Sequence, residues 1–365
     1  MKIHVFNPEH DLALAHNGAH FTAPHAAREL RMNLGFLPAL WAADGDIVLV
    51  DDVEFALKAG RRFKHRLADV LFMSPADLRV LGPSVSQVEV WGWDRAVRQQ
   101  LLEAGVSKEQ LPGEQHIDVM RSLSGRQTGV SFSEDLRRLL DSPSVVGRSQ
   151  TCFSIDEVEQ AVGNWGNVVL KSPWSSSGRG IKYVRQQLSE SQQGWCRRVL
   201  DQQGAIVAEI YNNKVIDFGM EFHAYADGSV SYAGLSMFQT QNGAYAGSIL
   251  ASEAYKREML SRYLPENLID DVQKAVVQCM CHYLSGRYIG PFGVDMMVVA
   301  GEGGSEAKGF LLNPCVEVNL RRTMGHVALS LTPPVTEPRQ LMRIVHEVNY
   351  ELRLSSMENN FVKLL

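Results

Sequence analysis

A lysine at the end of an apolar stretch, directly before a loop of small residues, is the first feature that could do chemistry. Val168-Val-Leu-Lys171 is followed by Ser175-Ser-Ser-Gly-Arg-Gly180, and a strand-like pattern resumes at 181–184. A lysine ammonium is a point charge for phosphate oxygens, and small residues let backbone N–H groups approach a ligand closely. In the usual phosphate-binding loop the lysine follows the glycines, whereas here it precedes them. An ordinary Gly/Ser hairpin is the alternative interpretation.

Two carboxylates and an amide form the second chemical feature. Asp295 lies among apolar residues in 290–300, and Glu317 and Asn319 are two apart in a second strand-like run. Residues two apart on a strand point to the same face. If the two runs pair as an antiparallel hairpin, their oxygens converge into a set of the kind that Mg²⁺ prefers, with phosphate oxygens and waters completing the octahedron. A solvent-facing strand with scattered charges is the alternative.

Basic residues follow the second run at once. Arg321 and Arg322 carry guanidinium groups, which suit carboxylate or phosphate ligands. His326 comes shortly after and could assist a substrate there, although a helix-capping or core histidine fits the sequence equally well. We take Arg322 and His326 as candidate substrate contacts.

The loop after the first strand is a third candidate region. Residues 2–6 read as a strand that Asn7-Pro8 ends, and Glu9, His10 and Asp11 follow. In an open α/β sheet, ligands collect at the carboxyl ends of the strands, so these three side chains are candidate substrate contacts. The alternative is a helix N-terminus with acidic residues in its first turn.

The elements that must position these residues fall into three units. Residues 1–115 alternate strands and helix-length spacers, which predicts a parallel α/β layer ending near Pro112-Gly113. We expect a second unit at 116–205, which carries the lysine loop. The third unit, 206–365, would hold the carboxylates, a mobile loop at 239–247 that includes Asn242, and a closing C-terminal helix at 338–353.

Composition limits the classes of function. The chain has 365 residues and a formal net charge of −5, which gives no support to non-specific nucleic-acid binding. No apolar run is long enough to span a bilayer, so we expect no membrane partner. The N-terminus enters a strand directly, unlike a signal peptide, and the five cysteines are scattered, so we expect reduced thiols and a cytoplasmic protein.

In the order of these pieces, the sequence resembles the ATP-grasp superfamily over about residues 120–330, with a preceding α/β layer similar to that family's N-terminal domain. The resemblance implies an α/β protein whose ATP-binding half is α+β and consists of two subdomains. It also implies ATP and Mg²⁺ as cofactors. Two Mg²⁺ ions are expected, and Mn²⁺ could replace Mg²⁺.

The resemblance also implies roles for individual residues. Lys171 would contact the nucleotide phosphates and act in catalysis, and Arg321 would steady the transferred phosphate. Arg126 stands where the family usually has an earlier lysine. The nucleotide contacts implied are Arg126, Lys171, Ser175, Ser176, Ser177, Gly178, Gly180, an adenine-facing hinge of Glu209, Ile210 and Tyr211, and Glu221 near ribose or phosphate. The implied metal ligands are Asp295, Glu317 and Asn319.

These roles lead to an expected reaction. A substrate carboxylate would attack the γ-phosphate of Mg-ATP to give an acyl-phosphate and ADP, and an amine, or less often a thiol, would then displace phosphate. The expected partners are a small-molecule or peptide carboxylate and an amine, and a homodimer is one expected assembly. A phosphotransferase acting on a small molecule and a non-catalytic ATP-binding protein are the alternatives.

Overall fold

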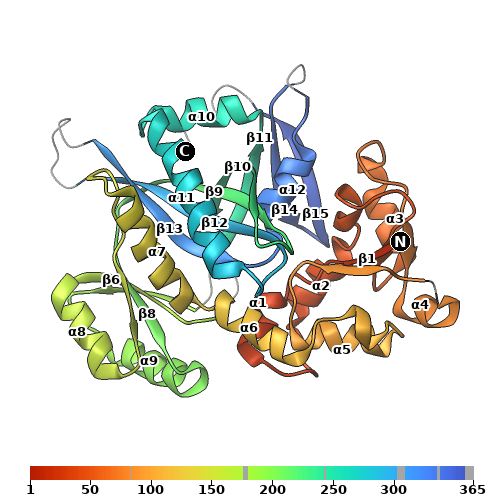
Figure 1. Cartoon of the computed structure of the whole chain (residues 1–365), viewed down its shortest axis with the longest axis horizontal. Helices are drawn as coiled ribbons and strands as arrows, with labels where there is room; N and C mark the ends of the chain where they lie inside the picture. Colours follow the sequence, from red (N-terminus) through yellow and green to blue (C-terminus); the bar gives the residue numbers. More distant parts are fainter. Residues whose placement is uncertain (83, 176–179, 242–243, 302–308, 335–337, 358–365) are drawn as a thin grey trace.

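The computed structural model describes residues 1–82, 84–175, 180–241, 244–301, 309–334 and 338–357. Its described strands form three sheets: a four-stranded parallel sheet, a four-stranded antiparallel sheet and a seven-stranded antiparallel sheet. The parallel sheet lies at one end of the molecule, the small antiparallel sheet at the other, and the large sheet between them (Figure 1). Within the described residues, no helix combines the length and the apolar character needed to cross a bilayer.

The N-terminal layer contains the parallel sheet, in the order β3-β2-β1-β4. Its strands are β1 (Lys2–Val5), β2 (Ile47–Leu49), β3 (Leu71–Met73) and β4 (Gln87–Val90). Its helices are α1 (His10–His16), α2 (His25–Asn33), α3 (Val53–Gly60), α4 (Pro75–Leu81), α5 (Arg95–Glu103) and the 3₁₀ turns η1 (Leu37–Leu40), η2 (Arg61–Phe63) and η3 (Lys108–Gln110). The parallel α/β layer predicted from the alternation of elements is confirmed, although β3, α3 and α4 were not predicted.

A helical pair leads from this layer to the central sheet. Helices α6 (Glu114–Ser124) and α7 (Arg126–Leu140) meet at Gly125, which is the C-cap of one and the N-cap of the other. Arg126 is the first residue of α7, and its backbone N–H donates to the carbonyl of Pro173 at 3.2 Å. The helix junction therefore lies against the segment that follows Lys171.

The central sheet presents one face to helices and leaves the other open. Its order is β5-β8-β6-β7, from β5 (Ser149–Cys152), β6 (Asn167–Lys171), β7 (Ile181–Arg185) and β8 (Ile206–Ile210). Helices α8 (Ile155–Trp165) and α9 (Glu190–Gln203) cover one face (Figure 1), where Val168 and Leu170 are fully buried. Because strand residues alternate, Val169 and Lys171 point to the opposite face. The predicted strand–lysine–loop–strand unit is confirmed by the antiparallel pairing of β6 with β7.

The seven-stranded sheet has the order β13-β12-β9-β10-β11-β14-β15. Its strands are β9 (Lys214–Ala224), β10 (Val230–Gln241), β11 (Ala244–Leu250), β12 (Gly290–Ala300), β13 (Phe310–Asn319), β14 (Gln340–His346) and β15 (Tyr350–Ser356). Helices α10 (Glu253–Ser261), α11 (Glu266–Leu284) and α12 (Met324–Leu331) complete the unit. The hairpin of β12 and β13 is confirmed, and in it Asp295 is the register partner of Glu317.

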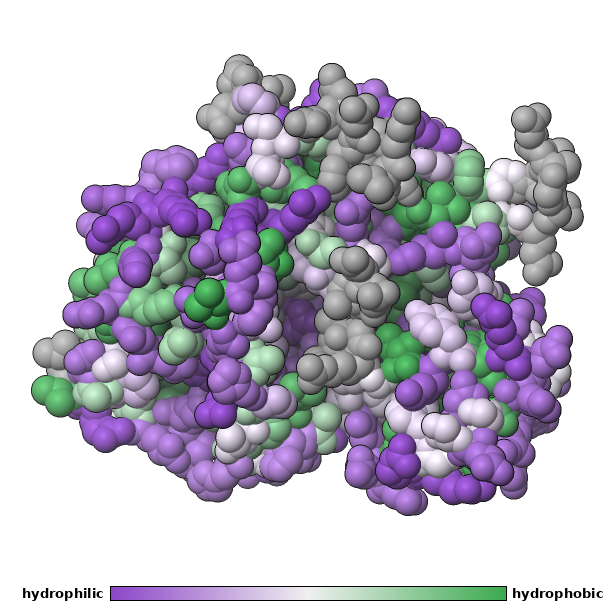
Figure 2. All heavy atoms as spheres, turned by 180° about the vertical axis from the view of Figure 1, so that it is seen from behind, coloured by the Kyte–Doolittle hydropathy of each residue, from purple (hydrophilic) through white to green (hydrophobic). Residues whose placement is uncertain are grey.

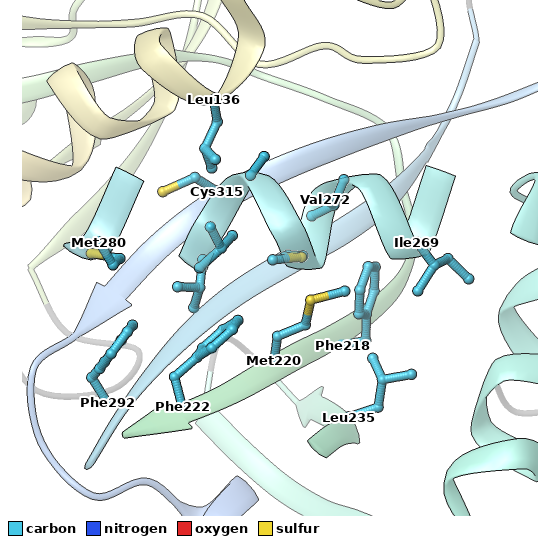
Figure 3. Close-up of a cluster of buried hydrophobic side chains, with 14 of the residues drawn as sticks. Leu136, Phe218, Met220, Phe222, Leu235, Ile269, Val272, Met280, Phe292 and Cys315 are labelled. Carbon is cyan, nitrogen blue, oxygen red and sulfur yellow. The ribbon is translucent and has the colours of Figure 1, made fainter. Parts of the chain in front are cut away.

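The largest core lies between this sheet and α11. Phe218, Met220 and Phe222 of β9 alternate with polar residues and point toward the helix, as Figure 3 shows. The rings of Phe222 and Phe292 stack with centroids 5.2 Å apart. Burying this face under α11 and α7 fixes the register, since a slip of one residue would exchange the two faces. Asp217 and Glu221 therefore lie on the opposite face of the sheet.

The predicted C-terminal helix at 338–353 is wrong. The chain instead forms β14 and β15, which pair with each other in antiparallel register, and β14 also pairs with β11. Leu341, Met342 and Leu352 are buried at the sheet. The spacing of the apolar residues fits a helix as well as a strand, and the free edge of β11, some ninety residues earlier, decides for strands.

The predicted mobile loop at 239–247 is also different from the structure. Its described residues are the ends of β10 and β11, in which Gln239 pairs with Gly247 and Thr240 with Tyr245. Asn242 lies outside the described residues. The division into three units stays a prediction. Strand β8, with which the predicted third unit begins, pairs in the central sheet with β5 and β6.

Candidate active site

A cleft of about 910 Å³ lies between the open face of the central sheet and the polar face of the seven-stranded sheet. The central sheet contributes Lys171 and Glu209 to its walls, and the large sheet contributes Asp295 and Glu317. Among the described residues of the N-terminal layer, Asp11 alone lines it. Seen from behind, the molecule is hollowed between its lobes, and hydrophilic side chains lie in the depression (Figure 2).

Lys171 is fixed at the bottom of this cleft. It is only 5% exposed, and its Nζ donates to the carbonyl of Val316 at 3.0 Å and pairs with Glu209 Oε2 at 2.8 Å. An ammonium group has three donors, so one N–H is left for a ligand oxygen. The lysine therefore bridges both walls and can still bind an anion.

The expected hinge of Glu209, Ile210 and Tyr211 also lines the cleft. However, the N–H of Ile210 donates to Arg148 O and that of Tyr211 to Asn167 O, each at 3.0 Å. These two backbone donors are engaged in holding the sheet together. A base bound at this edge would therefore need hydrogen-bonding groups other than these two N–H groups.

Arg126 lies beside the carboxylate wall. Its Nη1 donates to Ser172 O and to Ser175 Oγ, at 2.7 and 2.8 Å, and its Nη2 donates to Glu317 Oε1 at 2.6 Å. The Nε is buried and has no hydrogen-bond partner among the described residues. A guanidinium has five N–H donors, so this buried N–H and the second N–H on Nη2 are left without an acceptor among the described residues. Arg126 thus keeps an Nη2 donor for a ligand and lies next to Ser175.

The three predicted metal ligands are brought together. Asp295 and Glu317 face each other across β12 and β13, and Asn319 Nδ2 donates to Asp295 Oδ2 at 3.0 Å. The amide oxygen of Asn319 faces Arg321 instead, accepting from its Nη2 at 2.9 Å. In this arrangement only the two carboxylates offer free oxygen atoms, and Asn319 would have to turn its amide to act as a ligand.

Asp295 is the carboxylate that lacks a cation. Lys171, Lys214, Arg126 and Arg321 each pair with another acidic side chain, but Asp295 forms no ion pair within the described part of the chain. Burial, helped by Glu317 and Glu221, raises the pKa of Asp295 well above its usual value, against the effects of Arg321 and Asn319. An added divalent cation would remove this penalty.

The donor set is compatible with Mg²⁺ rather than with a closed protein cage. No group of three or more His, Cys, Asp or Glu side chains placed to hold a metal occurs among the described residues. Mg²⁺ is usually bound by one or two carboxylates plus substrate phosphates and water. Two facing carboxylates in an open cleft satisfy that requirement.

Glu221 is buried in the wall of the cleft, and both of its carboxylate oxygens accept hydrogen bonds from neighbouring side chains. Ser236 and Thr323 hydroxyls donate to it at 2.7 Å each, and His326 Nδ1 lies 3.1 Å away. Burial alone opposes its ionisation, but His326 and the two hydroxyls outweigh burial and lower its pKa. A Cβ at Gly325 would collide with the carboxylate, so the short Gly325 is required beside it. His326 therefore supports Glu221, and it does not line the cleft.

Arg321 is held by Asp11 from the N-terminal layer. Its Nε and Nη2 donate to the two carboxylate oxygens at 3.0 and 2.9 Å, although 310 residues separate the pair. Burial works against ionisation of Asp11, but Arg321 outweighs it and lowers the pKa of that carboxyl. Both residues line the cleft.

The other candidate substrate residues lie outside the cleft. Glu9 pairs with Arg31 at 2.7 Å, and His10 is buried with its Nδ1 3.0 Å from Asp94. Arg322 stacks on the ring of Trp41, 4.3 Å from its centroid, and burial lowers its pKa to about 10. None of the three lines the cleft, although His10 contributes to a small adjoining cavity.

The lysine loop is described only at its ends. Ser175 accepts from Arg126, and Gly180 adopts a φ of +67°, a conformation that favours glycine. The expected contacts Ser176, Ser177 and Gly178 lie outside the described residues.

Sequence reasoning missed several cleft residues. Tyr183 packs edge-to-face on the predicted hinge residue Tyr211, with centroids 6.1 Å apart, and Lys214 Nζ pairs with Asp217 at 2.5 Å. The further lining residues that were missed include Asn167, Phe238, Met296, Met297 and Met324. The alternation Ile216-Asp-Phe-Gly-Met-Glu221 was the available signal, because it places Asp217 and Glu221 on one face.

Comparison with known proteins identifies the arrangement of the sheets. No family model and no curated protein matches the chain. The biotin carboxylase domain of 2-oxoglutarate carboxylase from Hydrogenobacter thermophilus, solved with MgADP, ADP and bicarbonate, has a TM-score of 0.52. It is 14% identical, with 94% of this chain and 74% of that chain covered. The chain has the ATP-grasp fold.

Two further solved structures are similar to this chain. Biotin carboxylase from Campylobacter jejuni, in a complex with β,γ-ATP, is 11% identical with a TM-score of 0.51, covering 94% of this chain and 75% of that chain. A putative ATP-grasp superfamily protein from Archaeoglobus fulgidus is 15% identical with a TM-score of 0.49, covering 98% and 100%. At these identities the likeness concerns the fold alone, and roles for individual residues must come from the cleft itself.

Proposed function

We propose that the chain is a Mg-ATP-dependent ligase that activates a substrate carboxylate as an acyl-phosphate and joins it to an amine. The observation that carries this proposal is the meeting, in one cleft, of a bridging lysine and a pair of carboxylates without a full set of cations. The nucleotides in the two biotin carboxylase structures with the same fold support a nucleotide in this cleft.

The nucleotide would lie along the central sheet. Its base would sit near the aromatic pair of Tyr183 and Tyr211, at the far end of the cleft wall, where a flat ring can pack against an aromatic face. Its phosphates would extend toward Lys171, which keeps one donor for them, and toward Arg126, which keeps its second Nη2 donor. Both cations are held by protein carboxylates beforehand, so they are oriented before the nucleotide arrives.

Asp295 and Glu317 would hold Mg²⁺, with Asn319 joining after its amide turns. The ion would supply positive charge to the phosphate oxygens during transfer. Because Arg126 Nη2 donates to Glu317 Oε1, the other oxygen of that carboxylate would face the ion while Arg126 stays in place. The carboxylate and the γ-phosphate would be held in line by Arg126, Lys171 and Arg321, which is the main contribution that a protein makes to such a transfer.

Binding of a non-hydrolysable ATP analogue tests the nucleotide site. We expect calorimetry to show Mg²⁺-dependent binding to the wild type and a lower affinity for Lys171→Ala. The reaction itself is tested by ADP release across a panel of carboxylates and amines, with hydroxylamine as a trap. An acyl-phosphate gives a hydroxamate, so ADP release without hydroxamate would contradict the ligase and favour phosphotransfer to a hydroxyl.

The metal assignment is tested by Glu317→Gln. We expect ADP release to fall by about 100-fold or more, because a bound metal contributes several kcal/mol to charge stabilisation during transfer. Glu258→Gln, an exposed position on α10, is the matched control and should leave the rate unchanged. Full activity in Glu317→Gln would exclude the metal role.

A further inference from the structure

We infer that Asp11 is a positioning residue for Arg321, so that the N-terminal layer completes the reaction centre in the other half of the molecule. This inference rests on the proposed function, since it gives a role to Asp11 in that reaction. The pair joins α1 to the end of β13 by two hydrogen bonds in the side-on geometry that suits guanidinium and carboxylate.

Four of the five N–H donors of Arg321 are already engaged. A guanidinium group has five N–H donors. In Arg321 the Nε and one Nη2 donor go to Asp11, the second Nη2 donor goes to Asn319 Oδ1, and one Nη1 donor goes to Arg322 O. One N–H on Nη1 remains. The pairing with Asp11 therefore leaves Arg321 one N–H donor for a ligand in the cleft. Arg321 then cannot bind a phosphate through two parallel hydrogen bonds.

Asp11 is itself placed by a buried network. Asn7 Nδ2 donates to Gly92 O at 2.8 Å and to Asp94 Oδ2 at 3.1 Å, and His10 Nδ1 lies 3.0 Å from the same Asp94 oxygen. Asp94 also accepts from Val97 N at 2.8 Å, which caps α5. These hydrogen bonds hold the start of α1 against the segment between β4 and α5.

This network separates the roles of three neighbouring residues. His10 points back into the N-terminal layer and Glu9 turns to Arg31, whereas Asp11 points out to the cleft. Because His10 and Glu9 are anchored, Asp11 cannot follow Arg321 if that side chain moves. A fixed carboxylate facing an arginine sets the orientation of the arginine, and orientation is what a transfer reaction needs.

Asp11→Asn is the test variant. The amide keeps the volume but can no longer accept two charge-assisted bonds from Arg321. We expect kcat for ADP release to fall at least about tenfold, while KM for ATP and the affinity for the non-hydrolysable analogue change by less than about threefold. Asp69→Asn, at an exposed position of the same layer, is the matched control and should change neither constant. A loss confined to KM, or no loss at all, would overturn the inference.

A double-mutant cycle with Arg321→Lys provides a second readout. Lysine cannot reproduce the side-on pair, so Asp11→Asn should cost nothing further in the Arg321→Lys background, in kcat and in thermal stability alike. Additive losses would show that the two side chains act separately. The Tm measurement does not depend on activity, so the two proposals can fail separately. A wild type that binds no Mg-ATP would refute the ligase proposal. Additive Tm losses would refute the coupling of Asp11 with Arg321.

Discussion

The two four-stranded sheets formed by the described strands contribute to the cleft in different ways. In the parallel N-terminal sheet both faces are covered: Ile3 and Val5 pack in one buried cluster, and Phe6 and Val48 in another. No strand residue of this sheet lines the cleft. Its contribution is Asp11, from the helix that follows the carboxyl end of β1, where an open α/β sheet presents its ligand groups.

The antiparallel central sheet contributes a whole face. Its helices cover one side, where Val168, Leu170 and Ala208 are completely buried. Its other side offers Val169, Lys171 and Glu209 to the cleft. An antiparallel sheet can leave one face open, whereas a parallel sheet with crossover helices cannot. The covered sheet thus positions a single group at its edge, whereas the half-covered sheet forms a continuous binding wall.

The largest expected effect concerns the two faces of β6. Leu170→Ala should lower the free energy of unfolding by about 2–5 kcal/mol, because it empties a fully buried position under α8 and α9. Its neighbour Val169→Ala should cost less than that in stability and should instead weaken binding of the ATP analogue. Denaturant unfolding and calorimetry measure the two effects. A larger stability loss for Val169→Ala than for Leu170→Ala would mean that the faces are assigned the wrong way round.

An intermediate effect is expected at the carboxyl edge of the parallel sheet. A Cβ at Gly92 would collide with the ring of His10, so Gly92→Ala should cost about 1–3 kcal/mol of stability through overpacking. Because His10 anchors α1, the variant should also reduce turnover through Asp11 while the wall formed by the central sheet still binds nucleotide. Urea unfolding and the ADP-release assay report on the two parts.

Gly163→Ala on α8 is the control for this variant, because a Cβ there would meet no atom within 4 Å. It should be neutral or stabilise by up to about 1 kcal/mol, as expected for Gly→Ala in a helix. Equal losses in nucleotide affinity and turnover for Gly92→Ala would remove the distinction between edge and wall.

Local patterns were sufficient to predict the parts of the cleft that lie on neighbouring strands. Apolar residues before Lys171 predicted β6, and the spacing of Glu317 and Asn319 placed both on one face of β13. The hairpin of β12 and β13 then brought Asp295 opposite Glu317. In each case the positions depend on strand periodicity and on one short connection, which a single sequence contains.

The remaining parts depend on contacts between distant segments. The pairing of Asp11 with Arg321 joins residues 310 apart, and neither residue carries a local sign of the other. Strands β14 and β15 replace the helix predicted at 338–353, because the apolar spacing there is ambiguous until β11 supplies a partner. Likewise, Ile210 and Tyr211 were expected in an adenine-facing hinge, but their backbone N–H groups are engaged within the central sheet.

A final expected effect is the pH dependence of stability at the amino-terminal edge of the covered parallel sheet. The carboxylate of Asp46 accepts hydrogen bonds from the backbone N–H groups of Lys2 and Ala43 and is bonded to His4. Burial alone would raise its pKa, but these bonds outweigh it and lower the pKa to about 2 from a usual value of 3.8. A lowered pKa in the folded state means that the carboxylate stabilises the fold above pH 4 or so, and that this contribution disappears as the pH falls toward 2.

Asp46→Asn should therefore be about 2 kcal/mol less stable than the wild type at pH 7, and the difference should shrink to nothing between about pH 4 and pH 2. Chemical unfolding at a series of pH values measures this, with Asp69→Asn as the control whose difference should stay near zero throughout. Because Asp46 lies at the amino-terminal edge of the sheet and Asp11 beyond its carboxyl-terminal edge, ATP-analogue affinity at pH 7 should not change. A difference in stability that persists unaltered to pH 2 would show that Asp46 stabilises the layer by packing. Ionisation of its carboxyl group would then make no contribution to stability.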